Sequence, residues 1–255
     1  MKNISKWLFR PELYIVLILY FILGYVTLSF GDRWADVLFP EDYYFENVGA
    51  ISLFIASIIS FYIFLRALRT RAVTKTHWFK LLVLLGLAGL YFFGGGEEIS
   101  WGQRIFNIKE PAALAQENTQ NELNIHNLAI FENSKLLKAD NIFSVFWFSF
   151  AILIPAASWL WGRFKQFAER FSPIVYWGIG LLFAVNYIFA QIAKPVFAAG
   201  YTYPLIPYLQ AVQEVKESNY EFLFILLSLY VLWDLNNLIT ASGFGARNLT
   251  KDART

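Results

Sequence analysis

The sequence predicts an all-α, polytopic membrane protein with six transmembrane helices. Of its 255 residues, 57% are hydrophobic, 19% are aromatic and only 16% are charged, which is far from the composition of an average soluble domain. Several apolar segments approach or exceed the ~18–20 residues that a helix needs to cross a bilayer. Backbone polar groups in lipid must be satisfied within their own segment, so these spans are helices rather than open sheet. The predicted spans are residues 12–30, 47–66, 79–96, 142–161, 173–193 and 220–240.

Lysine and arginine are concentrated in alternate connections, and this distribution predicts the orientation of the chain. Bases gather at the N-terminus, in the second and fourth connections and in the tail, whereas the first connection and residues 97–140 are acidic. Positive residues favour the cytoplasmic side, so both termini are predicted to be cytoplasmic. We expect one transmembrane domain over residues 1–255 in the cell membrane, which we interpret as a bacterial inner membrane.

Charge and cysteine content narrow the expected partners and chemistry. The net charge of +2 hides the sorted distribution, and no nucleic-acid partner is expected. The chain has no cysteine, which excludes disulfides, thiol nucleophiles and thiolate metal ligands. Membrane lipid is the expected partner, and a homo-oligomer is left open.

The longest segments between spans, residues 97–141 and 194–219, are both predicted to face outward. No proline occurs in GEEISWGQRIF, so we expect the third helix to continue through it, with Glu97, Trp101 and Arg104 on one face. Short helices are expected within these outer segments.

Proline punctuates both outer segments. Pro111 fits the first position of a short helix, with good helix formers after it. Three prolines and Gly200 predict irregular chain over residues 195–207. From about residue 208 we expect helix again, running directly into the sixth span.

Three acidic elements are predicted to meet at the outer boundary of the membrane. Adjacent carboxylates at such a boundary are costly unless they are paired, solvated or bound to something. Because the elements lie at the same predicted depth, they form the candidate site. They are Glu97 with Glu98, Glu122 with His126, and Glu214 with Glu217 and Glu221.

Carboxylates with one imidazole and no thiolate predict a site for a hard-to-borderline divalent metal such as Zn, Mn, Fe or Mg. Such a metal could activate water for attack on an ester, an amide or a phosphate. The predicted metal ligands are Glu98, Glu122, His126, Glu214 and Glu217. The predicted catalytic residues are Glu97, Glu98 and His126, and the predicted substrate-binding residues are Gln103, Arg104, Asn118 and Asn124. Arg104 could hold an anionic headgroup in bidentate fashion.

A structural interpretation of the same residues stays open. Glu97 and Glu98 could be solvated boundary residues, and Glu214 and Glu217 could stabilise a helix start through the macrodipole. In the fifth span, Asn186 and Gln191 are expected to hydrogen-bond between helices. The triplet Gly94-Gly95-Gly96 is expected to permit close helix approach.

The string EEISWGQRIF, followed by N-x-Q-x-E-x-N-x-H-N, resembles a signature of bacterial polytopic membrane proteins of unknown function. It covers the segment from Glu97 to Asn127. The resemblance implies a multi-pass membrane protein and carries no known activity with it.

Two functions are compatible with this pattern. The first is a membrane-embedded hydrolase or transferase that acts on a lipid or lipid-linked substrate at an outward-facing site. The alternative is a non-enzymatic carrier or assembly partner. A carrier needs polar groups near the midplane that are reachable from both sides, and the central thirds of the spans contain almost no ionisable residue. The sequence therefore favours a site that opens to one side.

Overall fold

The protein is helical throughout the part of the chain that the computed structural model describes. That part comprises residues 7–30, 34, 37–39, 43–69, 78–103, 105–108, 111, 139–198 and 208–241, and it contains no strand. The predicted all-α class is thereby confirmed. The elements are α2 (Pro11–Val26), the 3-10 turn η1 (Thr27–Ser29), α4 (Tyr44–Leu68), α6 (Trp78–Glu98), the 3-10 turn η2 (Ser100–Gly102), α9 (Ala139–Phe148), the π-helical turn η3 (Ser149–Leu153), α10 (Ile154–Leu160), α11 (Gly162–Phe171), α12 (Trp177–Ala198) and α13 (Tyr208–Ala241).

Five helical segments in the described chain are long and apolar enough to cross a membrane, as expected of an integral membrane protein. α13, which contains the predicted sixth span, is not among them. It carries buried Lys216, Asn219 and Glu221 and partly buried Asp234. The five segments are Pro11–Ser29, Tyr44–Leu68, Trp78–Glu98, Asn141–Leu160 and Trp177–Pro195.

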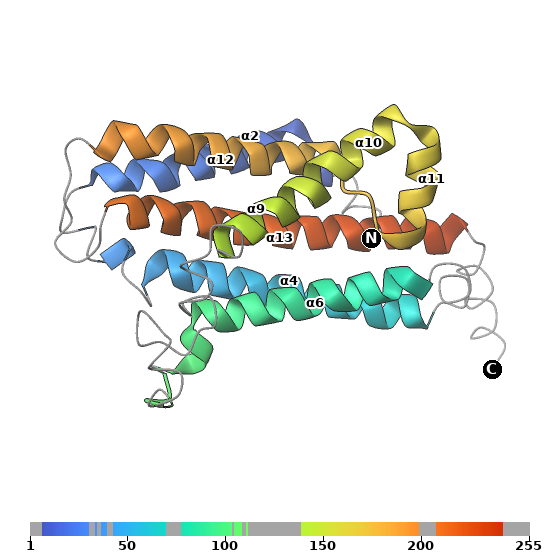
Figure 1. The fold of residues 1–255 in the computed structure, drawn as a ribbon, viewed down its shortest axis with the longest axis horizontal. Helices are drawn as coiled ribbons and strands as arrows, with labels where there is room; N and C mark the ends of the chain where they lie inside the picture. The colour runs from blue at the N-terminus through green and yellow to red at the C-terminus, as the bar shows by residue number, and fades with distance from the viewer. Residues whose placement is uncertain are drawn as a thin grey trace.

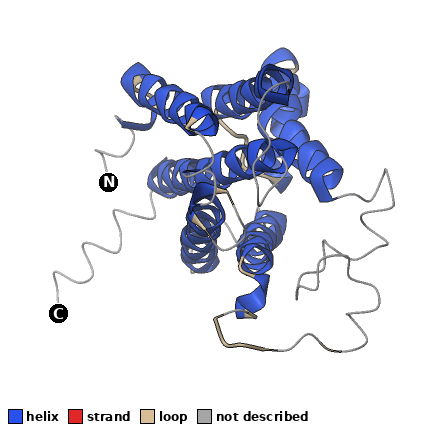
Figure 2. Cartoon of the chain, turned by 90° about the vertical axis from the view of Figure 1, so that its left-hand side faces the viewer, coloured by secondary structure: helices blue, strands red, loops and turns tan. Residues whose placement is uncertain are grey.

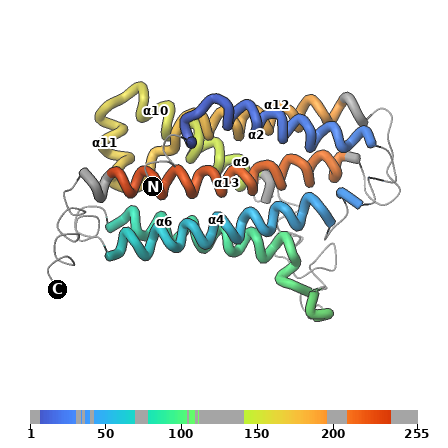
Figure 3. The backbone as a smooth tube through the Cα atoms, turned by 180° about the vertical axis from the view of Figure 1, so that it is seen from behind, coloured from blue at the N-terminus to red at the C-terminus, as the bar shows by residue number. Residues whose placement is uncertain are grey.

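α13 is the central helix of the bundle (Figures 1 and 2). It packs against α4 on one side and against α12 and α2 on the other. α4 and α6 form a close pair below it, while α2 and α12 lie side by side above it (Figures 1 and 3). A polar residue on α13 is therefore surrounded by other helices and not by lipid.

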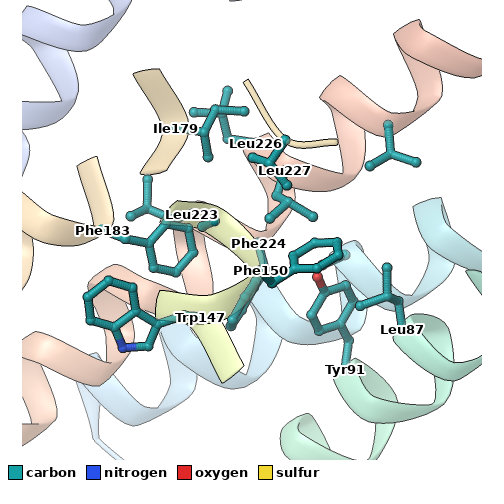
Figure 4. Packing of buried hydrophobic residues seen from close by; sticks show 14 of the residues in the cluster. Leu87, Tyr91, Trp147, Phe150, Ile179, Phe183, Leu223, Phe224, Leu226 and Leu227 are labelled. Atoms are coloured by element: carbon teal, nitrogen blue, oxygen red, sulfur yellow. The ribbon is translucent and has the colours of Figure 1, made fainter. Parts of the chain in front are cut away.

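An aromatic core fills the middle of the bundle (Figure 4). The ring of Tyr91 in α6 lies 4.8 Å from that of Phe224 in α13, centre to centre. Trp147 in α9 stacks on Phe183 in α12 at 5.8 Å. Such ring pairs contribute ~0.5–1.5 kcal/mol beyond their buried area. The core thus joins four helices and separates the two ends of the bundle.

Glycine allows α6 to approach α4. A Cβ at Gly95 would lie 3.3 Å from the carbonyl oxygen of Ala50 and 3.2 Å from the ring of Phe54. The prediction that the glycine triplet permits close approach is confirmed. Because the triplet packs on α4, α6 does not end there but continues to Glu98.

The predicted fourth span, residues 142–161, is one helical segment with a π-helical turn in it. Pro155 has no N–H to donate to the carbonyl of Ala151 one turn earlier, and the helix widens at this point. The carbonyl oxygen of Ala151 occupies the space that a Cβ at Gly180 of α12 would need. The proline and the glycine therefore form one packing device.

The last two helices differ in how well they follow the predicted boundaries. α12 continues through Pro195 to Ala198, so the expectation of irregular chain from residue 195 is wrong at its start. Residues 199–207 lie outside the described chain. α13 begins at Tyr208 and runs through residues 220–240 without a break, which confirms the expected helix start.

Charged side chains are sorted between the two ends of the bundle. We call the end where α4 begins and α6 ends the carboxylate end, and the opposite end the basic end (Figure 1). In the described chain the carboxylate end holds Glu46, Glu97, Glu98, Glu214, Glu217 and Glu221, together with Lys194 and Lys216. The basic end holds Arg10, Arg66, Arg69, Lys80, Arg163, Lys165 and Arg170, together with Glu12, Glu169 and Asp234.

Replacing Gly180 by alanine should destabilise the protein by ~1–3 kcal/mol, because the new methyl group collides with the carbonyl of Ala151. Gly86→Ala is the matched control, since a Cβ there meets no atom within 4 Å. The control should leave stability unchanged or raise it by up to ~1 kcal/mol. Thermal unfolding of the two purified variants in detergent measures the difference. Equal midpoints would contradict the packing described for Gly180.

Candidate functional site

A pair of glutamates from two helices forms the centre of the candidate site. Glu98 is the last residue of α6 and Glu221 lies in α13, and their side chains hydrogen-bond to each other. Glu221 is only 5% exposed, and Glu98 is partly buried. An ionised carboxylate can only accept hydrogen bonds, so this bond requires a proton on one partner. We call these two residues the carboxyl pair.

Gly49 of α4 makes room for the carboxyl pair. A Cβ at this position would overlap Oε2 of Glu221. That oxygen is buried and has no hydrogen-bond partner within the described part of the chain. Leaving a buried acceptor unsatisfied costs ~1–3 kcal/mol. Such an atom calls for an explanation, and a bound ligand or a catalytic role is one of the few available.

Further glutamates surround the carboxyl pair. Glu46, in the first turn of α4, and Glu217 of α13 interact electrostatically with both members of the pair. Glu214 interacts with Glu221. We call these five residues the carboxylate cluster. The fold therefore brings the first and third acidic elements of the sequence together, because α6 ends beside the second to fourth turns of α13.

The chain turns sharply after Glu98. Ser100, Trp101 and Gly102 have φ values of 45°, 54° and 75°, in the left-handed region. This conformation costs a residue other than glycine roughly 1–2 kcal/mol. The expectation that the third helix continues as far as Arg104 is therefore wrong. Backbone strain of this kind is concentrated at functional sites, where the surrounding structure maintains it.

Trp101 shows what maintains the turn. Its ring lies against Gly96, where a Cβ would come within 2.8 Å of it. Its Nε1–H donates a hydrogen bond to Oε1 of Glu97 at 2.6 Å. The expected contact between Glu97 and Trp101 thus exists, but through a reversed chain and not through a continuous helix. The two adjacent glutamates have different partners: Glu97 bonds to Trp101, and Glu98 bonds to Glu221.

A second polar network lies one turn of α13 away from the carboxyl pair. The amide of Asn186, which is fully buried, accepts hydrogen bonds from Tyr25 Oη–H and from Asn219 Nδ2–H, both at 3.0 Å. It donates to the carbonyl oxygen of Lys216 at 2.9 Å. These bonds join α2, α12 and α13, as expected for Asn186. Gln191, predicted for the same role, is exposed on α12.

Lys216 supplies a positive charge near the carboxylate cluster. Its side chain is 8% exposed, and Nζ donates to Oε1 of Gln213 at 2.6 Å. The amide nitrogen of Gln213 in turn donates to Glu217. A relay from a cation through an amide to a carboxylate offsets part of the negative charge that gathers here.

The structure describes only part of the predicted site. Gln103 lies in the turn after η2, where its N–H donates to the carbonyl oxygen of Ser100 at 2.9 Å. Five predicted site residues lie outside the described residues: Arg104, Asn118, Glu122, Asn124 and His126. Among the residues that are described, no group of three or more carboxylate or imidazole side chains is placed to hold a metal ion. The metal site stays a prediction, since two of its five ligands are in the undescribed segment.

Sequence reasoning missed the importance of two members of the carboxylate cluster. Glu221 had a visible signal, because it continues the face of Glu214 and Glu217 into an apolar span. Glu46 counted only toward the acidic first connection. Its spacing of three residues from Gly49 places both on one face of α4, but nothing in the sequence pairs that face with α13.

Comparison with known proteins adds no relative to this description. No protein-family model matches the chain, and no curated protein or solved structure is significantly similar to it.

Replacing Glu221 by glutamine should remove a protonated carboxyl group from the interior. Infrared difference spectra of the wild type, recorded between acidic and alkaline pH, should show the C=O stretch of the carboxyl pair. That band should be lost in Glu221→Gln and in Glu98→Gln, and should persist in Glu12→Gln, whose carboxylate is exposed on α2. A spectrum unchanged by both substitutions would contradict the shared proton.

Proposed function

We propose that this protein is a membrane-embedded hydrolase or transferase that acts on a lipid or lipid-linked substrate, with Glu98 and Glu221 as its acid–base pair. The observation that carries the proposal is the hydrogen bond between these two carboxyl groups within the bundle. Two carboxyl groups that share one proton supply a general acid and a general base at the same point.

The chemistry of such a pair is balanced in protons. The ionised member accepts a proton from water, or from an acceptor hydroxyl, as its oxygen attacks a carbonyl or phosphoryl centre. The protonated member gives its proton to the leaving oxygen as the bond to that oxygen breaks. After one turnover the pair again holds one proton, now on the other member. General acid–base catalysis of this kind contributes roughly 10²–10⁴-fold to a rate.

Exposed apolar surface beside Glu98 supports a substrate with a hydrocarbon chain. Trp101 contacts the rings of Phe93 and Phe92, with centres 5.4 Å and 6.3 Å apart, and all three side chains are exposed. Ile105 and Phe106, in the same turn, are also exposed. A polar cluster bordered by apolar surface suits a ligand with a polar head and an acyl or prenyl chain.

The core of the bundle favours this proposal over a carrier. A carrier needs a polar path that connects the two ends. Between the carboxylate cluster and Asp234, α13 contributes Phe224 and Leu227 to the buried apolar core, and Ser228 bonds to Ser60 at 3.1 Å. The described residues in this layer therefore pack against one another, as expected for a site that is reached from one end.

The proposal includes a sixth span and an orientation. The central position of α13 supports its assignment as the sixth span despite its polar residues, because neighbouring helices cover them. The sorted charges support a cytoplasmic basic end and an outward-facing carboxylate end. Contacts of the headgroup with Gln103, Arg104, Asn118 and Asn124, and metal binding with His126, stay predictions.

Orientation can be measured directly, because the natural chain has no cysteine. Single cysteines introduced at Asn118 and at Thr74 should react oppositely with an impermeant thiol reagent applied to intact cells. Asn118→Cys should be labelled from outside, and Thr74→Cys only after the membrane is permeabilised. Equal labelling of both variants would contradict the six-span arrangement.

Catalysis can be tested without knowing the substrate. Purified protein in nanodiscs is incubated with total membrane lipid extract, and the lipids are compared by untargeted mass spectrometry. The wild type and Glu12→Gln should convert the same lipid species, whereas Glu98→Gln and Glu221→Gln should lose at least ~100-fold of the rate. Thermal unfolding of each variant shows that it is folded. If the wild type converts no lipid, or the pair variants convert it at the normal rate, the proposal fails.

A further inference from the structure

α11 differs from the other helices in its direction. It runs across the bundle axis at the basic end, while the membrane-crossing helices run along that axis (Figures 1 and 3). Trp161 is in extended conformation between α10 and α11, which accounts for the change in direction. A helix perpendicular to membrane-crossing helices lies in the plane of the membrane surface.

The sequence of α11 divides it into an apolar face and a polar face. Phe164, Phe167, Ala168 and Phe171 follow the i, i+3, i+4, i+7 pattern of one helical face. The ring of Phe171 packs on Phe79 at the start of α6, with centres 5.2 Å apart, and Ala168 is buried. The apolar face thus holds α11 against the end of the bundle.

The polar face carries bases that are exposed. Lys165 pairs with Glu169 at 3.8 Å, and both side chains are about half exposed, so this pair contributes little energy. Arg163 and Arg170 are exposed, and neither has an ion-pair partner in the described part of the chain. Their spacing of seven residues puts both on the same side of the helix.

Exposed tryptophans lie beside these bases. Trp159 is 86% exposed and Trp161 is 66% exposed, and they flank the junction between α10 and α11. Tryptophan is enriched at the level of lipid headgroups, where its ring contacts acyl chains and its N–H contacts polar groups. Exposed indoles with unpaired arginines therefore match a lipid surface better than an acidic protein.

We propose that α11 is a binding surface for anionic phospholipid headgroups, with Arg163, Lys165 and Arg170 as the bases that contact phosphate. Trp159 and Trp161 set the depth of the helix in the interface. This surface lies at the opposite end of the bundle from the carboxylate cluster, so it is independent of the proposed enzyme site. An amphipathic helix with bases on its polar face binds anionic lipid through buried apolar area and charge together.

The test uses full-length protein, delipidated in neutral detergent and titrated with phosphatidylglycerol or phosphatidylcholine, with binding read by native mass spectrometry. The wild type should prefer phosphatidylglycerol. Replacing Arg163, Lys165 and Arg170 by glutamine should lower its affinity on the order of a hundredfold, at roughly fivefold per base. The preference should weaken as salt is raised.

Two further variants keep the outcome interpretable. Arg10→Gln with Arg69→Gln removes bases at the same end but outside α11, and should leave the preference unchanged. Arg163→Lys with Arg170→Lys keeps the charge and should retain binding. Equal affinity for both lipids, an unchanged preference in the triple glutamine variant, or tighter binding of a polyglutamate peptide than of phosphatidylglycerol would each overturn the proposal.

Discussion

The carboxyl pair is the constraint on which the arrangement of three helices depends. Two carboxyl groups can meet inside a bundle only if they share a proton and if the neighbouring backbone leaves space for them. Glu98 and Glu221 meet this condition because Gly49 of α4 has no side chain at the point of contact. α4, α6 and α13 therefore come together around two oxygen-rich groups, at an end of the bundle that is otherwise aromatic. Burying these groups is costly, and a catalytic or binding role is the simplest reason to maintain them.

The segment after α6 is built around that constraint. If α6 continued, the chain would extend past the carboxyl pair; instead, three left-handed residues turn it back so that Trp101 covers Gly96 and bonds to Glu97. The strain of the turn is offset by this packing. The glycines, the two glutamates and the tryptophan of GGGEEISWG thus each have a structural task. The motif positions a strained turn beside a buried acid, which fits a site better than a simple connection.

Composition and periodicity were sufficient to predict the helices, because a lipid-facing helix must be apolar along its whole length. The start of α13 near residue 208 and the close approach at the glycine triplet also follow from local sequence. Three features do not. Trp101 has no intrinsic preference for the left-handed region, so only its tertiary contact with Gly96 explains the turn. The partner of Glu98 is distant in sequence, and no period connects α6 with α13. The π-helical turn had a signal in Pro155, but its consequence depends on Gly180 in another helix.

A double-mutant cycle between Glu98 and Glu221 tests the central claim most directly. The free energy of unfolding is measured in detergent for the wild type, Glu98→Gln, Glu221→Gln and the double variant. If the two side chains share a proton and a hydrogen bond, the effects should be non-additive, with a coupling energy of ~0.5–3 kcal/mol. The same cycle between Glu221 and Glu12 should give no coupling, because Glu12 lies at the other end of the bundle. Additive effects at Glu98 and Glu221 would show that the two carboxyl groups do not interact.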